Sequence, residues 1–416
     1  MVDPQASRRR LLRYLAASPL FAGAPAFAQA PVPQTRLPDP MIWAPRELNE
    51  LIDSPSRAIN VFDFEPVARQ KMSAAHFGYL ATGNDDEVTL RANREGFAAF
   101  QLRPRRLIDV SRVDMKMELF GATWDSPIVI APTASNKAFH ADGEIAVAKA
   151  ARAGRHLQML STVATTSIED AIEARGAPLW FQLYPTNEWH VGLAMAKRAE
   201  KAGAPAIVVT VDVLAAQNWE MFQRLWRADK EGAAQCGSCH GMGLRSFVRR
   251  KPHFDGLDLG AATSTGATNL TWDFIKRLRD TVGTKILLKG ILAREDAKLA
   301  VEHGVNGIVV SNHGGRSEDN GRSTIEVLPE ILVAVDGRIP VLVDSGFRRG
   351  TDIVKALAMG AKAVCIGRPY LWGLGAFGQE GVERVLHLLR RELFAAMQQM
   401  GAPSLKDLVP AMVTRA

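Results

Sequence analysis

A histidine and an arginine stand three residues apart in the segment Ser311-Asn312-His313-Gly314-Gly315-Arg316. The segment follows a short apolar run, 307–310, whose composition predicts a buried strand. Both side chains are therefore expected on the loop that leaves a strand end. An imidazole can exchange a proton near neutral pH, and a guanidinium can hold a carboxylate through paired N–H donors. Their spacing predicts an acid–base site for an anionic substrate.

Eight short, continuously apolar stretches predict strands that are buried on both faces. Helical patterns separate them along the chain, and this alternation predicts an α/β protein with a (β/α)₈ TIM barrel. A doubly wound sheet is the alternative, but no G-x-G-x-x-G motif follows an early strand. The predicted strands are Pro127–Ala131, Leu157–Leu160, Leu179–Leu183, Ala206–Val211, Lys285–Leu288, Gly307–Val310, Pro340–Val343 and Ala363–Ile366.

The chain divides into four parts on this interpretation. Residues 1–30 form a signal peptide, and 31–100 form a Pro-rich lead-in followed by an N-terminal helical extension. Residues 101–410 form the barrel. Inside it, 214–270 form a long loop after the fourth strand, which is expected to cover the mouth of the barrel because long connections in compact domains are commonly lids or binding loops.

Polar residues follow the predicted strands at the end where a barrel carries its active site. Lys289 ends the fifth strand, and Asp344 follows the seventh. The last two strand ends combine glycine with arginine, at Gly346, Arg348, Gly367 and Arg368, which predicts a phosphate site. A positive charge at Lys289 would stabilise an electron-rich reduced ring, as a flavin requires.

These motifs resemble the FMN-dependent α-hydroxy acid dehydrogenase/oxidase family, which includes glycolate oxidase, L-lactate dehydrogenase and mandelate dehydrogenase. The resemblance covers residues 46–410. Besides Ser-Asn-His-Gly-Gly-Arg, it rests on Leu-Leu-Lys-Gly, Ile-Ala-Pro-Thr-Ala, Phe-Gln-Leu-Tyr and Arg-Arg-Gly-Thr-Asp. It implies FMN at the mouth of the barrel and oxidation of an (S)-2-hydroxy acid, such as lactate, glycolate or mandelate, to the 2-oxo acid.

The resemblance also implies roles for individual residues. His313 matches the catalytic base, and Asp212 matches the carboxylate that stabilises its protonated form. Arg316 matches a substrate-carboxylate ligand, while Tyr79 and Tyr184 match the tyrosines that contact the substrate. The matching FMN ligands are Pro132, Thr133, Ala134, Ser161, Gln182, Thr210, Lys289, Asp344, Gly346, Arg348, Gly367 and Arg368.

The chain departs from this family at Trp219, where a second carboxylate-binding arginine is usual. Either Arg224 or Arg227 replaces that arginine, or the substrate is larger or less anionic and packs against Trp219. Val163 stands where the family often has a bulky residue, which leaves room for a larger substituent.

The long loop also contains Cys236-Gly237-Ser238-Cys239-His240, the attachment signature of c-type haem. Met242 and His253 are candidates for a second axial ligand. A zinc site at Cys236, Cys239, His240 and His253 and a simple disulfide are the alternatives. The remaining cysteine, Cys365, lies in a predicted strand and is interpreted as core filling.

The N-terminus predicts export to the periplasm. Arg8, Arg9 and Arg10 precede a small-residue apolar stretch that ends near Phe27, which is the layout of a twin-arginine signal. No other apolar run approaches the roughly 20 residues that span a bilayer. The formal net charge of +7 includes +3 from residues 1–30, where four arginines face one aspartate. The absence of a long Lys/Arg run argues against nucleic-acid binding.

The sequence therefore predicts an FMN-dependent (S)-2-hydroxy-acid dehydrogenase or oxidase. The family resemblance implies that the protein forms a homo-oligomer. The alternatives are another FMN barrel enzyme, such as a type 2 isopentenyl diphosphate isomerase, and a non-catalytic flavin or haem electron carrier. The pairing of His313 with Arg316 argues against the first alternative, and the presence of Tyr79 and Tyr184 beside that pair argues against the second. Oxygen, a quinone and a cytochrome all remain open as the electron acceptor.

Overall fold

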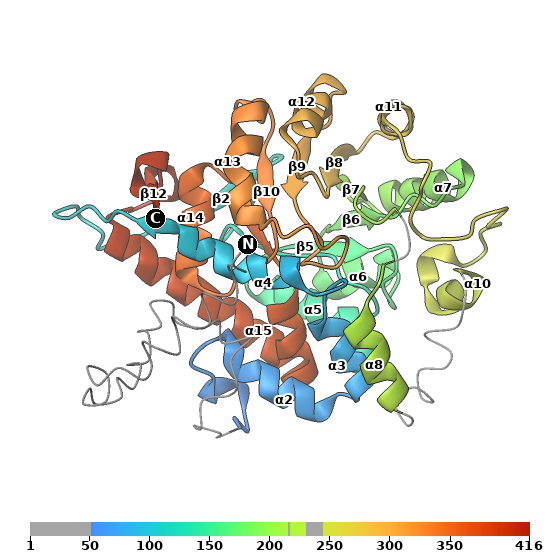
Figure 1. The fold of residues 1–416 in the computed structure, drawn as a ribbon, viewed down its shortest axis with the longest axis horizontal. Helices are drawn as coiled ribbons and strands as arrows, with labels where there is room; N and C mark the ends of the chain where they lie inside the picture. The colour runs from blue at the N-terminus through green and yellow to red at the C-terminus, as the bar shows by residue number, and fades with distance from the viewer. Residues whose placement is uncertain (1–50, 215–216, 230–243) are drawn as a thin grey trace, which may run out of the picture. The chain divides into compact units, whose positions relative to one another are not determined.

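Eight parallel strands close into a barrel in the computed structural model, which describes residues 51–214, 217–229 and 244–416. The strands follow one another around the barrel in chain order, and every predicted strand is confirmed with its bounds shifted by two residues at most (Figure 1). They are β4 Ile128–Ile130, β5 Leu157–Ser161, β6 Trp180–Leu183, β7 Ala206–Thr210, β8 Lys285–Lys289, β9 Gly307–Val310, β10 Val341–Val343 and β11 Ala363–Ile366.

Helices connect the strands and surround the barrel, as the sequence predicts (Figure 1). The final helix, α15, contains a kink at Phe377 and Gly378, where the backbone leaves helical geometry. The connecting helices are α5 Gly143–Ala153, α6 Ile168–Arg175, α7 Trp189–Lys201, α11 Trp272–Thr281, α12 Arg294–Glu302, α13 Thr324–Val335, α14 Gly350–Met359 and α15 Arg368–Met400.

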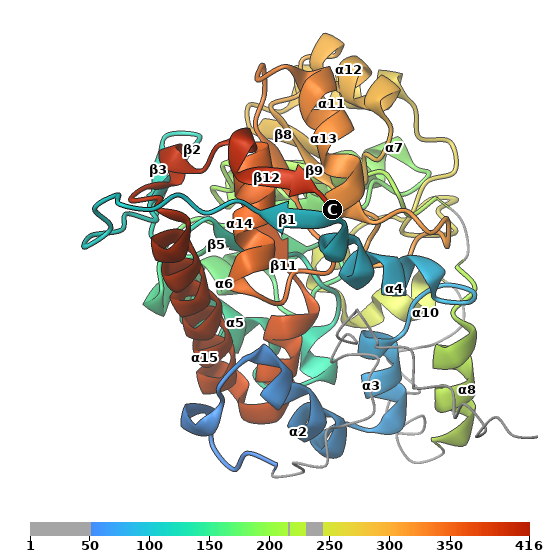
Figure 2. The ribbon, with the colours of Figure 1, turned by 60° about the vertical axis from the view of Figure 1, so that its left-hand side comes forward.

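The predicted N-terminal helical extension consists of α2 Phe64–Lys71, α3 Ala74–Ala81 and α4 Val88–Glu95. After it, β1 Phe100–Leu102 pairs antiparallel with β12 Val413–Arg415, and the two strands lie side by side in Figure 2. The ordered fold therefore continues past residue 410, the predicted end of the barrel.

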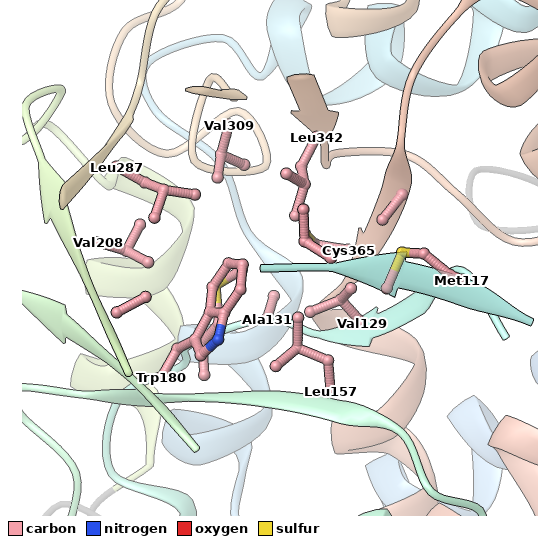
Figure 3. Close-up of a cluster of buried hydrophobic side chains, with 14 residues drawn as sticks. Met117, Val129, Ala131, Leu157, Trp180, Val208, Leu287, Val309, Leu342 and Cys365 are labelled. Carbon is pink, nitrogen blue, oxygen red and sulfur yellow. The ribbon is translucent and has the colours of Figure 1, made fainter. Parts of the chain in front are cut away.

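Apolar side chains from the strands fill the interior of the barrel (Figure 3). A hairpin of β2 Met117–Leu119 and β3 Ala122–Trp124 adds Met117 and Leu119 to the same buried cluster. Phe120 at its turn packs on Trp180, with ring centroids 5.4 Å apart. Cys365 belongs to this cluster, which confirms its interpretation as core filling. The core supports the strand ends that carry the polar residues.

The described parts of the loop after β7 lie against these strand ends. Helix α8, Glu220–Ala228, runs beside α3, as both views show (Figures 1 and 2). Further along, Lys251 donates to the Ser135 hydroxyl and His253 Nδ1 lies 2.9 Å from the Thr162 carbonyl oxygen. A short helix, α10 Leu244–Phe247, precedes them. No helix within the described ranges has both the length and the apolar character that crossing a bilayer requires.

Candidate active site

Three neighbouring strands end in a hydrogen-bonded row of buried side chains. Ser161 Oγ donates to Gln182 Oε1 at 3.0 Å, and Gln182 Nε2 donates to Thr210 Oγ1 at 2.9 Å. Each residue ends or nearly ends its strand and is at most 3% exposed. The row fixes the orientation of the Gln182 amide, which is the arrangement expected for groups that read the polar edge of a flat ring.

Lys289, the last residue of β8, places a buried cation next to this row. Lys289 Nζ donates to Ser311 Oγ at 2.8 Å and lies 3.3 Å from Asp344 Oδ2. Burial by itself disfavours the charged amine, but the carboxylates of Asp344 and Asp212 outweigh that effect and raise the pKa of Lys289. Lys289 is therefore a fixed positive charge in the wall of the site.

The predicted base and its carboxylate partner are in direct contact. His313 Nδ1 lies 3.0 Å from Asp212 Oδ1, and Tyr184 Oη lies 3.2 Å from His313 Nε2. Burial alone would raise the pKa of Asp212, yet His313 and Lys289 together hold it below its usual range. An ionised Asp212 places the imidazole proton on Nδ1, so Nε2 is the acceptor that faces Tyr184.

Two glycines make this contact possible. A Cβ on Gly290 would lie 2.6 Å from Asp212 Cβ, so a side chain after Lys289 would displace the carboxylate. Gly315 has a φ of +77° and its backbone packs on the backbone of Leu90 in α4. His313 itself adopts a left-handed φ of +58°, a conformation that costs energy in a non-glycine residue and is held here by its bonds to Asp212 and Ser311.

Arg316 packs against two aromatic rings that meet edge to face. Its guanidinium carbon is 4.6 Å from the Tyr79 ring centroid and 4.2 Å from that of Trp219. Nη1 donates to the carbonyl oxygens of Tyr79 and Thr82. Nη2 is buried and has no hydrogen-bond partner among the described residues, so this nitrogen is available to a bound carboxylate.

The opposite end of the site collects positive charge. Arg348 is buried with its guanidinium carbon 4.8 Å from the Trp372 ring centroid, and Gly367 precedes the N-terminus of α15. Burial, reinforced by Arg316 and Arg348, lowers the pKa of Arg368 to about 9. Buried like charges of this kind are relieved by an anion, and a helix N-terminus also favours one.

Arg368 also forms hydrogen bonds that connect two parts of the chain. Its guanidinium donates to the carbonyl oxygens of Leu80, Thr82 and Gly314. These bonds connect the end of α3 to the catalytic loop, which we define as residues 311–316. Its role as a phosphate ligand stays a prediction. One cavity joins the two ends of the site, and its lining includes Pro132, Thr133, Ala134, Ser161, Tyr184, Lys289, His313, Arg316, Asp344, Gly346, Arg348, Gly367 and Arg368.

Other predictions on the long loop have different outcomes. Arg224 is exposed and pairs with Glu220 at 3.5 Å, and Arg227 is exposed too, so neither reaches the cavity. His253 is 1% exposed and packs on Phe181, which leaves no open face for a haem. Val163 is buried and does not line the cavity, and its carbonyl oxygen accepts a hydrogen bond from the Ser135 N–H. The motif Cys236–His240 and Met242 lie outside the described residues.

Comparison with known proteins identifies the family. Residues 68–415 match the model of the FMN-dependent dehydrogenases. The chain belongs to this family. It is 39% identical to glycolate oxidase 3 of Arabidopsis thaliana over 84% of this chain and 94% of that protein, and 40% identical to an L-lactate oxidase of Lysinibacillus sphaericus over 83% and 90%. Among solved structures, a mandelate oxidase variant with (S)-mandelic acid superimposes with a TM-score of 0.74 at 34% identity, over 86% of this chain and 98% of that one.

The geometry fits the cofactor of this family. The row from Ser161 to Thr210, with Lys289 beside it, offers donors and a cation to an isoalloxazine ring. The crowded guanidinium groups at Arg348 and Arg368 offer positive charge to a phosphate. FMN is therefore expected to span the cavity from Lys289 to the N-terminus of α15.

Some residues that build the site were not singled out from the sequence. Glu144 is 1% exposed and accepts four hydrogen bonds, from the backbone N–H groups of Asn136 and Thr165 and from the hydroxyls of Thr165 and Thr166. It joins the loop after β4, which carries Thr133, to the loop after β5, the strand that ends at Ser161. The side-chain amides of Asn93 in α4 and Asn312 form two hydrogen bonds with each other, and these fix the loop that carries His313 to α4.

We expect Glu144→Ala to weaken FMN binding by at least about tenfold, because two buried N–H groups lose their acceptor and the loops they hold loosen. Glu144→Gln keeps one oxygen for both N–H groups and is expected to lose much less. Fluorescence titration of the FMN-free protein with FMN measures both. Equal affinity in Glu144→Ala and wild type would contradict the role assigned to Glu144.

Glu318 makes the stability of the fold depend on pH. Burial and the charge of Asp212 raise its pKa from 4.5 to about 7. Between these values the folded chain binds more protons than the unfolded chain, so stability falls as pH rises through this window. Glu318→Gln cannot ionise and should be more stable than wild type by on the order of 1 kcal/mol at pH 8.5, after allowance for partial exposure.

The same variant should match wild type at pH 4.5, where both side chains are neutral. Urea unfolding at the two pH values measures this difference. Glu118→Gln, an exposed change on β2, is the control and should alter neither value. A Glu318→Gln effect of equal size at both pH values would show that the ionisation of Glu318 is not its cause.

Proposed function

We propose that this protein oxidises an (S)-2-hydroxy acid to the corresponding 2-oxo acid, with His313 as the base. The observation that carries the proposal is the contact of His313 with both Asp212 and Tyr184, at the cavity that Lys289 also lines. Membership of the FMN-dependent dehydrogenases and the names of the relatives, which include glycolate, L-lactate and mandelate oxidases, agree with it.

Each residue has a task that its position supports. Arg316 Nη2 binds the substrate carboxylate, and Tyr184 turns its hydroxyl from His313 Nε2 to the substrate. Nε2 is then free to take the proton that the substrate loses. Asp212 keeps Nδ1–H in place and stabilises the imidazolium that forms, because its own pKa is held low.

FMN, when bound, would accept the two electrons and one of the two protons that leave the substrate, while His313 takes the other proton. Lys289 supplies a fixed positive charge at the wall of the cavity, and its bond to Ser311 and its ion pair with Asp344 keep that charge in place. Buried cations and ordered donors need no reorganisation when negative charge develops.

Export and haem binding are further parts of the proposal. The arginine cluster and apolar stretch within residues 1–30 support a periplasmic location, and Cys236-x-x-Cys239-His240 supports a c-type haem that would carry electrons onward singly. The sequence alone supports both, since these residues lie outside the described ranges. A zinc ion and a disulfide remain alternative uses of the two cysteines.

An anaerobic absorption titration of the mature holoprotein with a panel of (S)-2-hydroxy acids tests the function. We expect at least one acid to bleach the flavin band. A haem band in the same spectrum would show that the protein carries the haem predicted at Cys236, Cys239 and His240. A flavin band that no hydroxy acid bleaches would overturn the proposal.

A matched pair of variants isolates the base. His313→Gln should retain the flavin spectrum and slow its bleaching by at least about a hundredfold, because the proton acceptor is gone. His190→Gln changes an exposed histidine on α7 and should bleach at the wild-type rate. Bleaching of both variants at one rate would remove His313 from the mechanism.

A further inference from the structure

Trp219 makes two separate contacts with Arg316, the proposed ligand of the substrate carboxylate. Its indole Nε1 donates to the Arg316 carbonyl oxygen at 3.1 Å, and its ring lies 4.2 Å from the guanidinium carbon of the same residue. The indole N–H is therefore already used, and only the carbon surface of the ring is left for other contacts. Trp219 stands directly behind Tyr79 and Arg316, which line the cavity.

The ring belongs to an aromatic cluster beside the site. Trp219, Tyr79 and Phe222 contact one another edge to face, with centroids 5.8 to 6.2 Å apart. Tyr79 also stacks on Phe139, at 6.4 Å, and both of these residues line the cavity. This end of the cavity therefore has an extended apolar wall.

The segment that carries Trp219 is held in register with the catalytic loop. Asn218 N–H donates to Asn84 Oδ1 at 2.7 Å, and the Asn84 N–H donates to the Gly315 carbonyl oxygen at 2.9 Å. Asp85 N–H also donates to the Asn218 carbonyl oxygen. Trp219 is thus positioned by the same backbone that positions His313 and Arg316.

The arginines nearest to Trp219 have most of their donors bound to other partners. Arg316 has its Nη1 committed to two carbonyl oxygens, Arg368 donates to three, and Arg224 points into solvent with Glu220. Among the described residues, Arg316 therefore has Nη2 left for a carboxylate, and the aromatic residues Tyr79 and Phe139 line the cavity beside it.

We propose that Trp219 is a specificity-determining residue that makes the site select 2-hydroxy acids with a large apolar substituent. This inference rests on the proposed function and names its substrate class. A small acid depends on its carboxylate for binding, and Arg316 offers it one unpaired guanidinium nitrogen, Nη2. A large aryl or branched alkyl group gains affinity by leaving water for the aromatic wall.

The test compares kcat/KM for (S)-lactate and (S)-3-phenyllactate, which differ by one phenyl ring. Wild type should prefer phenyllactate by at least about tenfold, the effect of burying one ring. Trp219→Arg should raise kcat/KM for lactate by about ten- to a hundredfold through one added charge-assisted bond, mainly in KM, and lower it for phenyllactate.

Two controls separate the ring from the charge. Trp219→Phe keeps an aromatic ring without the bond to the Arg316 carbonyl and should keep the preference for phenyllactate. Met221→Arg adds the same charge at an exposed position two residues away and should leave the ratio of the two acids unchanged.

The outcomes distinguish this inference from the proposed function. If both acids reduce the flavin equally well in wild type, or if Trp219→Arg leaves their ratio unaltered, the role of Trp219 is refuted and the function stands. If neither these two nor any other hydroxy acid reduces the flavin, the proposed function fails and the inference falls with it.

Discussion

The active site depends on one buried carboxylate that lies beside an imidazole and near an ammonium group. Asp212 is 4% exposed at its side chain and contacts His313, while Lys289 contributes a positive charge. A carboxylate taken out of water is strongly unfavourable unless it is paired, so the three groups stabilise one another's charged or polarised forms. Removing the charge of Lys289 would raise the pKa of Asp212, and a protonated Asp212 would no longer fix the orientation of the imidazole.

The barrel delivers these groups because each stands at or just after a strand end. Lys289 ends β8, Asp212 follows β7, and Asp344 follows β10. The closed parallel sheet brings distant parts of the chain together, such as Asp212 and His313, which lie 101 positions apart. Ser311 then bridges Lys289 and Asp344 through two hydrogen bonds of 2.8 and 2.9 Å. His313 occupies a strained backbone conformation, which persists because the surrounding bonds over-determine it.

The strands and helices follow from the sequence because their periodicity is strong, and the strand-end residues follow from the barrel they imply. The pairing of His313 with Asp212 was expected from the family resemblance and appears at 3.0 Å. Glu144 and Glu318 were not foreseen, because a buried glutamate has no local sequence signature until its partners are placed. The outward position of Arg224 also depends on how α8 packs against α3, a tertiary contact that spacing along one helix does not determine.

Anaerobic stopped-flow reduction of the Asp212→Asn holoprotein tests the central claim most directly. The neutral amide can no longer favour the proton on Nδ1 or stabilise the imidazolium, so the rate of flavin reduction at saturating substrate should fall by about 10² to 10⁴ while FMN remains bound. Reduction at the wild-type rate, with the cofactor in place, would contradict the account, since His313 would then act without the charge of Asp212.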